Sequence, residues 1–193
     1  MVNSNWSTTV YVTEGIQKLT ADNPEVKGGV RFAKIDAVTG SAVTSGKGTL
    51  SGATIGIYPA GSDTAVLTIK TGSNGIAATE ANALPYGRYY AKEVAGSEGY
   101  LLNADWRDEF DIVKNGVIVD RTENILSEPP IYGGVKFSKI DQKRNTNIPQ
   151  GNATLEGAEI TVYNNSGKEI TLKDGTKITD KAAVITIMTN TDG

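Results

Sequence analysis

Hydrophobic and polar residues alternate with a period of two over much of this chain. In residues 30–34, Val30, Phe32 and Lys34 fall on one side of the alternation, and Arg31 and Ala33 fall on the other. Successive side chains of a β-strand point to opposite faces, so this pattern predicts a strand. Similar segments follow at 54–58, 65–69, 87–94, 109–113 and 117–125.

Turn-forming residues separate these segments. Residues 61–63, 72–75 and 114–116 supply the glycines and short polar side chains that tight turns favour. No segment keeps a helical period over a useful length. About seven short strands within about 100 residues predict an all-β fold, specifically an antiparallel β-sandwich.

The chain also matches itself. Residues 28–58 align with residues 133–163 at a constant offset of 105, with 14 identities in 31 positions. Residues 68–71 resemble residues 186–189 at an offset of 118, so the second copy has gained 13 residues in between. Self-similarity at a fixed spacing indicates tandem structural repeats.

A weaker similarity relates the start of the chain to its middle: residues 5–24, beginning at Asn5, resemble residues 105–129. We therefore expect three parts. These are the C-terminal tail of a preceding repeat at 1–27, a complete sandwich at 28–131, and the N-terminal part of a following, truncated repeat at 132–193.

Composition excludes several classes of function. The 193 residues include no histidine and no cysteine, which removes His-based catalysis, thiolate metal sites and disulfides. The net charge is −3 and the basic residues are scattered, so we expect no nucleic-acid partner. No cofactor or metal is expected. An acidic cluster at 105–111 is interpreted as a solvated strand edge, with a calcium site as the alternative.

Targeting signals are also missing from these residues. No apolar run approaches the length of a membrane span, and the first residues lack the basic start and apolar core of a signal peptide. We expect no membrane contact, and we expect any signal peptide and anchor to lie outside this chain.

One lysine stands out chemically. Lys34 shares a strand face with Val30 and Phe32, and a lysine directed into a core loses hydration and tends to become a neutral, nucleophilic amine. Such a lysine needs a partner. Glu93 shares a face with neighbouring apolar residues of its strand, and Asn124 is placed on the last strand before residues 128–130, which are interpreted as a linker. The alternative interpretation is a lysine that extends to solvent, a surface glutamate and an ordinary hydrogen-bonded asparagine.

Three motifs carry a family resemblance. Residues 28–36, 50–58 and 84–100 resemble the Cna protein B-type, or SpaA-type, domain of Gram-positive surface adhesins and pilins, and 84–100 resembles the E-box of that family. The motifs span nearly all of 28–131. The resemblance implies a transthyretin-like Greek-key sandwich in which a first-strand lysine and a last-strand asparagine form an isopeptide bond, assisted by the E-box glutamate.

The resemblance also implies roles for particular residues. By position, the cross-linked lysine is Lys34, the catalytic glutamate is Glu93 and the acceptor is Asn124, with Asn115 and Asp120 as weaker acceptor candidates. The E-box here lacks the proline that usually precedes its Gly-Tyr pair.

The partial copies hold only part of this set. Residues 132–193 keep the second-repeat lysine, Lys139, and residues 1–27 keep the preceding-repeat asparagine, Asn23. Neither part is expected to close a bond of its own.

We expect a structural stalk or spacer repeat of an adhesin or pilin, attached to the cell wall on the outside of a Gram-positive bacterium, and not an enzyme. The expected partners are neighbouring repeats of the same polypeptide, with a host matrix protein or glycan bound through other domains. The alternative is a ligand-binding adhesin module that recognises a host protein or polysaccharide. The loops are poor in aromatic residues, which favours the stalk.

Overall fold

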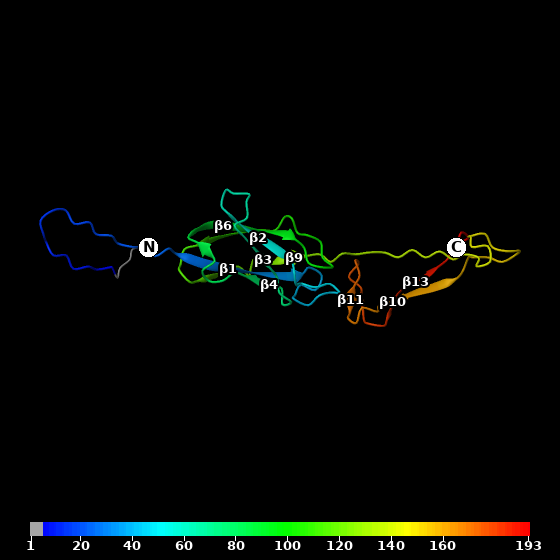
Figure 1. Ribbon diagram of the computed structural model, residues 1–193. Coiled ribbons are helices and arrows are strands. Elements are labelled where there is room, and N and C mark those ends of the chain that lie inside the picture. Colours follow the sequence, from blue (N-terminus) through cyan, green and yellow to red (C-terminus); the bar gives the residue numbers. More distant parts are fainter. Residues whose placement is uncertain (1–5) are drawn as a thin grey trace.

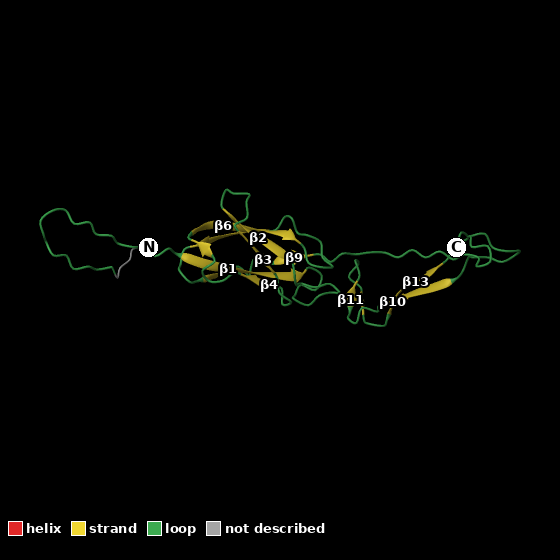
Figure 2. Cartoon of the chain, viewed as in Figure 1, coloured by secondary structure: helices red, strands yellow, loops and turns green. Residues whose placement is uncertain are grey.

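The structure is a computed structural model that describes residues 6–193, so Asn5, where the weaker similarity begins, lies outside the described residues. The described chain consists of strands and loops (Figure 2). Between residues 6 and 193 no helix offers the long apolar run that a bilayer crossing requires. The strands are β1 Lys27–Asp36, β2 Thr54–Pro59, β3 Leu67–Lys70, β4 Ile76–Ala78, β5 Leu84–Pro85, β6 Gly87–Ala95, β7 Arg107–Ile112, β8 Ile118–Asp120, β9 Leu126–Glu128, β10 Glu159–Tyr163, β11 Ile170–Thr171, β12 Lys177–Ile178 and β13 Ala183–Met188.

Strands β1–β9 form two sheets of a sandwich. In one sheet the long strand β1 pairs with β4 and β5 in antiparallel and with β8 and β9 in parallel. The other sheet has the order β3-β2-β6-β7 and is antiparallel throughout. The predicted all-β sandwich is confirmed. The prediction of purely antiparallel pairing is corrected, because β1 runs parallel to the last two strands.

The core lies between these sheets and is centred on β1. Val30 and Phe32 are fully buried, as the alternation predicted. The Phe32 ring meets the rings of Trp106 and Phe110 edge-on, with centroids 5.5 and 5.8 Å apart. Burying a phenylalanine contributes about 2–3 kcal/mol, so this cluster is a main source of stability.

The predicted segments at 54–58, 65–69, 87–94 and 109–113 correspond to β2, β3, β6 and β7. The predicted strand at 117–125 is corrected. Strand β8 ends at Asp120, residues 121–125 include a turn, and β9 then covers Leu126–Glu128. The pattern also missed β4 and β5, which have only three and two residues and so are too short to show a period.

The described chain contains no strand in its first 21 residues, 6–26, which carry exposed apolar side chains such as Tyr11, Val12 and Ile16. After the sandwich, the chain runs outwards and then returns through β10, so that β11 lies near the sandwich again (Figure 1). We call residues 132–193 the C-terminal segment. It contains two antiparallel pairs, β10–β13 and β11–β12.

The C-terminal segment reproduces part of the sandwich locally. The pair β10–β13 matches the pair β2–β3 residue for residue: Ile160 faces Ile187 as Ile55 faces Ile69. However, residues 133–140 form no strand, and Phe137 is 44% exposed. A second complete sandwich is therefore not present in the described residues, and the tandem-repeat organisation stays a prediction.

Candidate functional site

The candidate site lies at the end of β1 and begins with Lys34. Its side chain is fully buried on the same face as Phe32. The ammonium nitrogen Nζ donates to Ser97 Oγ at 2.6 Å, lies 2.7 Å from Glu128 Oε2, and sits 4.3 Å from the centre of the Tyr100 ring. A buried ammonium needs such partners because burial removes its hydration. The alternative of a lysine extended to solvent is wrong.

Glu128 reaches Lys34 through the pairing of the first and last strands of the sandwich. In the parallel pair β1–β9, Lys34 lies beside Leu126 and Asp36 lies beside Glu128. Residues at even spacing along β9 share a face, so Leu126 and Glu128 both enter the core, and both are fully buried. Glu128 makes a charge contact with Lys34, yet neither of its carboxyl oxygens has a well-aligned hydrogen bond from a described residue.

Glu93 approaches the same place from the opposite sheet. It lies on β6, is only 4% exposed, and accepts a hydrogen bond from the backbone N–H of Asn103 at 2.7 Å through Oε2. Its other oxygen, Oε1, has no hydrogen-bond partner among the described residues. The interpretation of Glu93 as a surface residue is therefore wrong, and its side chain is placed beside the Lys34–Glu128 pair.

The Glu93 carboxyl alters the chemistry of Glu128. Burial raises the pKa of Glu128, the adjacent Glu93 carboxyl raises it further, and the ammonium of Lys34 only partly opposes this, so the pKa reaches about 8. A single proton shared by the two acids gives the three groups a net charge of zero, because one carboxylate balances Lys34. A buried amine next to a protonated carboxyl is the reactant pair for amide formation.

A third buried acid, Asp36, lies at the same site. Tyr100, whose ring covers Lys34, donates its hydroxyl to Asp36 Oδ2 at 2.6 Å. Asp36 also accepts the backbone N–H groups of Val38, Thr39 and Ser45. Although burial opposes its charged form, these hydrogen bonds lower the pKa of Asp36. Burial and the hydrogen bond to Asp36 raise the pKa of Tyr100.

The structure does not bring Asn124 to this site. Asn124 is exposed in the turn before β9, where its backbone carbonyl accepts the indole N–H of Trp106 at 3.2 Å and its N–H donates to Arg121. The weaker candidates lie elsewhere too. Asn115 accepts the backbone N–H of Lys27, and Asp120 forms an exposed pair with Arg31 that lowers the pKa of Asp120.

Sequence reasoning missed Glu128 because it was interpreted as part of a linker. One signal could have found it: Leu126 and Glu128 alternate around Ser127, as residues of a half-buried strand do. The acidic cluster at 105–111 also needs a correction. Asp108 is not at a solvated edge, since its buried carboxylate forms a bidentate contact with Arg121.

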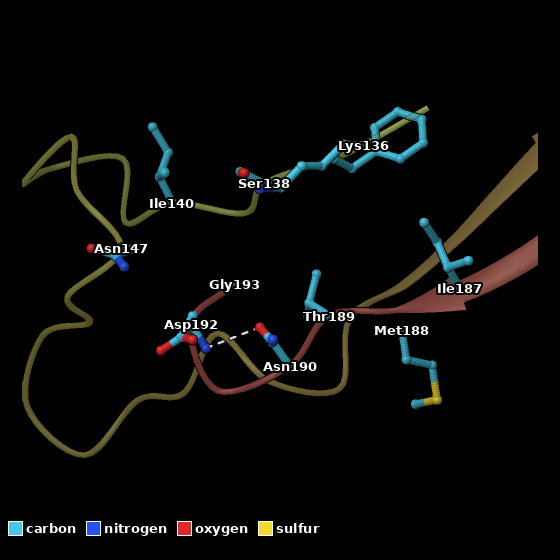
Figure 3. Close-up of a pocket in the computed structure, with 11 residues that line it drawn as sticks. Lys136, Ser138, Ile140, Asn147, Ile187, Met188, Thr189, Asn190, Asp192 and Gly193 are labelled. Atoms are coloured by element: carbon cyan, nitrogen blue, oxygen red, sulfur yellow. Dashed lines mark hydrogen bonds between the residues drawn. The ribbon is translucent and has the colours of Figure 1, made fainter. Parts of the chain in front are cut away.

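The residues from the partial copies are not part of the site. Asn23 is exposed, in a part of the chain without strands. Lys139 is half-buried, and its backbone N–H donates to the carbonyl of Gly193, just as that of Lys34 donates to Gly75. Figure 3 shows this region, in which Lys136 and Ile187 line an open pocket of about 580 Å³. Nothing in the C-terminal segment encloses Lys139 as the sandwich encloses Lys34.

A family model described as the SpaA prealbumin-like fold domain matches residues 28–125. Among solved structures, the Bacillus anthracis TIE protein is 27% identical with a TM-score of 0.53, over 87% of this chain and 25% of that protein. A single-residue variant of BcpA, the major pilin subunit of Bacillus cereus, is 19% identical with a TM-score of 0.37, over 53% of this chain and 28% of the pilin.

The minor pilin GBS52 of Streptococcus agalactiae is 17% identical with a TM-score of 0.38, over 60% of this chain and 49% of the pilin. This chain therefore spans between a quarter and a half of the solved relatives described here. The comparison with curated protein sequences gave no match.

Proposed function

Because this chain belongs to the SpaA family of prealbumin-like fold domains, we propose that it is a structural spacer module of a Gram-positive pilus or surface adhesin. The observation that carries the proposal is the buried contact between Lys34 and Glu128, which joins the first strand of the sandwich to the last. Relatives of similar fold include the pilin subunits named above.

The parallel pairing of β1 with β9 suits a domain that transmits tension along the chain. The chain enters the sandwich at the start of β1 and leaves it at the end of β9, and the two strands are parallel neighbours. Pulling the two ends apart therefore loads the β1–β9 hydrogen bonds together, in shear. A strong contact between Lys34 and Glu128 lies directly across this shear plane.

We propose further that the contact becomes covalent, with Glu128 as the acceptor in place of the expected Asn124. Three observations support Glu128: its carboxyl lies 2.7 Å from Nζ, burial favours its protonated form, and Glu93 adjoins it. Asn124 is exposed, whereas Lys34 is fully buried.

The step balances with the groups present. The Lys34 ammonium passes one proton to the Glu93 carboxylate, and the neutral Nζ then bonds to Cδ of protonated Glu128. Nζ loses a second proton, which Glu93 relays to the departing hydroxyl group, and water leaves as the C–N bond replaces the C–OH bond. Glu93 ends protonated, and no other reactant is needed.

Intact-mass spectrometry of the folded chain tests the bond. An amide between Lys34 and Glu128 releases water and lowers the mass by about 18 Da, while one between Lys34 and Asn124 releases ammonia and lowers it by about 17 Da. We expect the 18 Da deficit in the unaltered chain and in N124A, and no deficit in K34M, E93A or E128A, which lack the amine, the proton relay and the acceptor carboxyl respectively. A full-length mass in the unaltered chain overturns the covalent proposal, and a 17 Da deficit that N124A abolishes restores Asn124 as the acceptor.

Single-molecule stretching tests the spacer role separately. With the bond in place, the 93 residues between Lys34 and Glu128 cannot extend, so about 300 Å of extension is missing compared with K34M. Even without the bond, shear loading of β1 against β9 predicts a higher unfolding force than pulling between positions 54 and 70, which peels β3 from β2. A chain that unfolds at equal force in both directions, with full extension, would not serve as a load-bearing spacer.

A further inference from the structure

The small hairpin β11–β12 in the C-terminal segment touches the sandwich. The backbone N–H of Thr171 donates to Ser45 Oγ at 2.9 Å, and the backbone N–H of Gly46 donates to the carbonyl of Glu169 at 3.3 Å. Ile170 covers Gly46, so closely that a Cβ added to this glycine would meet the Ile170 side chain at 3.3 Å. At the edge of this contact, the Lys168 ammonium donates to Thr44 Oγ1 at 3.1 Å.

This hairpin is extra material within its own strand pair. The pair β2–β3 is joined by the short stretch 60–66, whereas the matching pair β10–β13 is joined by residues 164–182, which contain β11 and β12. Because the two pairs have the same register, the additional residues are not needed to form β10–β13. Their structural effect is the contact with residues 44–46 of the sandwich.

The loop that receives the hairpin is held firmly. The backbone N–H of Ser45 donates to buried Asp36, and that of Thr49 donates to the carbonyl of Glu98. Gly48 lies against the Tyr100 ring, where a Cβ would come within 2.8 Å. The hairpin therefore rests on a loop fixed by the same Asp36 and Tyr100 that enclose Lys34.

The direct connection between the two parts has little stiffness of its own. It includes Gly133 and Gly134, around which an added Cβ would meet no other atom within 4 Å. A hollow of about 930 Å³ separates the parts, and Ile131 and Tyr163 in its lining are 58% and 60% exposed. The sandwich and the C-terminal segment thus share no packed core at the joint, and the contact of the hairpin with residues 44–46 is what restrains it.

We propose that the β11–β12 hairpin is a docking element whose partner is the 44–48 loop of the preceding sandwich, and that it converts a two-glycine hinge into a joint of fixed angle. The inference does not depend on a covalent bond at Lys34. It assigns the 13 added residues a mechanical role in setting the direction in which the chain leaves the sandwich.

The test measures the distance between the two parts. The chain contains no cysteine, so spin labels at E98C and K143C report the geometry without background. We expect a single narrow distance distribution in the otherwise unaltered chain. Replacing residues 164–182 by residues 59–64, which restores the short connection, is expected to broaden the distribution at least twofold. K173A, at the exposed hairpin turn, is the matched control and should leave it narrow.

Hydrogen exchange gives a second readout that does not depend on the labels. S45A/I170D removes the acceptor of the Thr171 amide and the apolar cover of Gly46, so both amides should exchange about tenfold faster, as expected for the loss of about one net hydrogen bond each. The amides of β10 and β13 should keep their protection, which shows that the strand pair carrying the hairpin still folds. A distribution that is already broad in the unaltered chain, or one that is equally narrow after shortening, overturns the proposal.

Discussion

The chain without Lys34 should lose stability as the pH rises from 5 to 8. K34M keeps the approximate volume of the side chain but removes the amine, so no amide can form and Glu128 remains a buried acid beside Glu93. Burial and Glu93 raise the pKa of Glu128 from its ordinary value of 4.5 to about 8 while Lys34 is present and opposes them. Removing Lys34 leaves the pKa at least as high.

The sign follows from where the proton binds. A carboxyl with a raised pKa in the folded state binds its proton more tightly there than in the unfolded chain. Its contribution to stability is complete below pH 4.5 and is lost as the pH rises through 8. The free energy of unfolding of K34M should therefore fall by about 1.4 kcal/mol for each pH unit, and by about 4 kcal/mol between pH 5 and pH 8.

Few other groups of this protein titrate between pH 5 and 8. The chain has no histidine and no cysteine, so no side chain with an ordinary pKa has its titration midpoint between pH 5 and 8; the terminal amino group is the one ordinary group that does. Urea denaturation followed by the fluorescence of buried Trp106, at pH 5, 6, 7 and 8, measures the slope.

The matched control is K34M/E128Q, which has the same cavity shape and no acid at position 128. It should be nearly flat over the same pH range. A flat profile in K34M itself would refute the reasoning, since it would mean that Glu128 is ionised in the folded core at pH 5 or has moved to water.

Three further outcomes are expected. G75A should destabilise the chain by at least 2 kcal/mol more than G61A in urea denaturation. Both glycines have a positive φ, but only at Gly75 would a Cβ collide with a backbone atom, the carbonyl oxygen of Lys34. Equal losses of unfolding free energy in the two variants would contradict this. R121M should lower the free energy of unfolding by about 3 kcal/mol at pH 7, because it leaves the buried Asp108 carboxylate unpaired, and D108N/R121M should recover most of that loss. A double variant no more stable than R121M would count against an ionic role for this pair. N124A should change the free energy of unfolding by less than about 0.5 kcal/mol, because the side chain is exposed and the contact with Trp106 uses the backbone carbonyl. A large loss of stability would show that the Asn124 side chain acts in the folded core.

The sequence alone determined the class of the fold and one side of the site. Alternation of apolar and polar residues is a local property, and it placed Phe32 and Lys34 on one buried face and Glu93 on the inner face of its own strand. The same local pattern located β2, β3, β6 and β7. Each of these conclusions needs only neighbouring residues, because side-chain direction repeats every two positions in a strand.

Only the tertiary structure decided the partner of Lys34. That choice depends on the pairing of β1 with β9, two strands more than 90 residues apart, and a shift of one position in β9 would turn Glu128 outwards. The two prolines after Glu128 made the segment look like a linker, since proline is rare inside sheets. In the folded chain they follow β9 and do not interrupt it, and Pro130 forms an isolated antiparallel bridge with Tyr100.

The contact of the β11–β12 hairpin was equally hidden from the sequence. The internal match revealed that 13 residues had been added and that they include a turn-forming stretch. It did not reveal that the hairpin contacts residues 44–46, which lie more than 120 positions earlier in the chain. Local patterns state which residues face inwards. Which inward-facing or projecting groups meet depends on strand register and on how the chain folds back, and both are fixed by packing across the whole molecule.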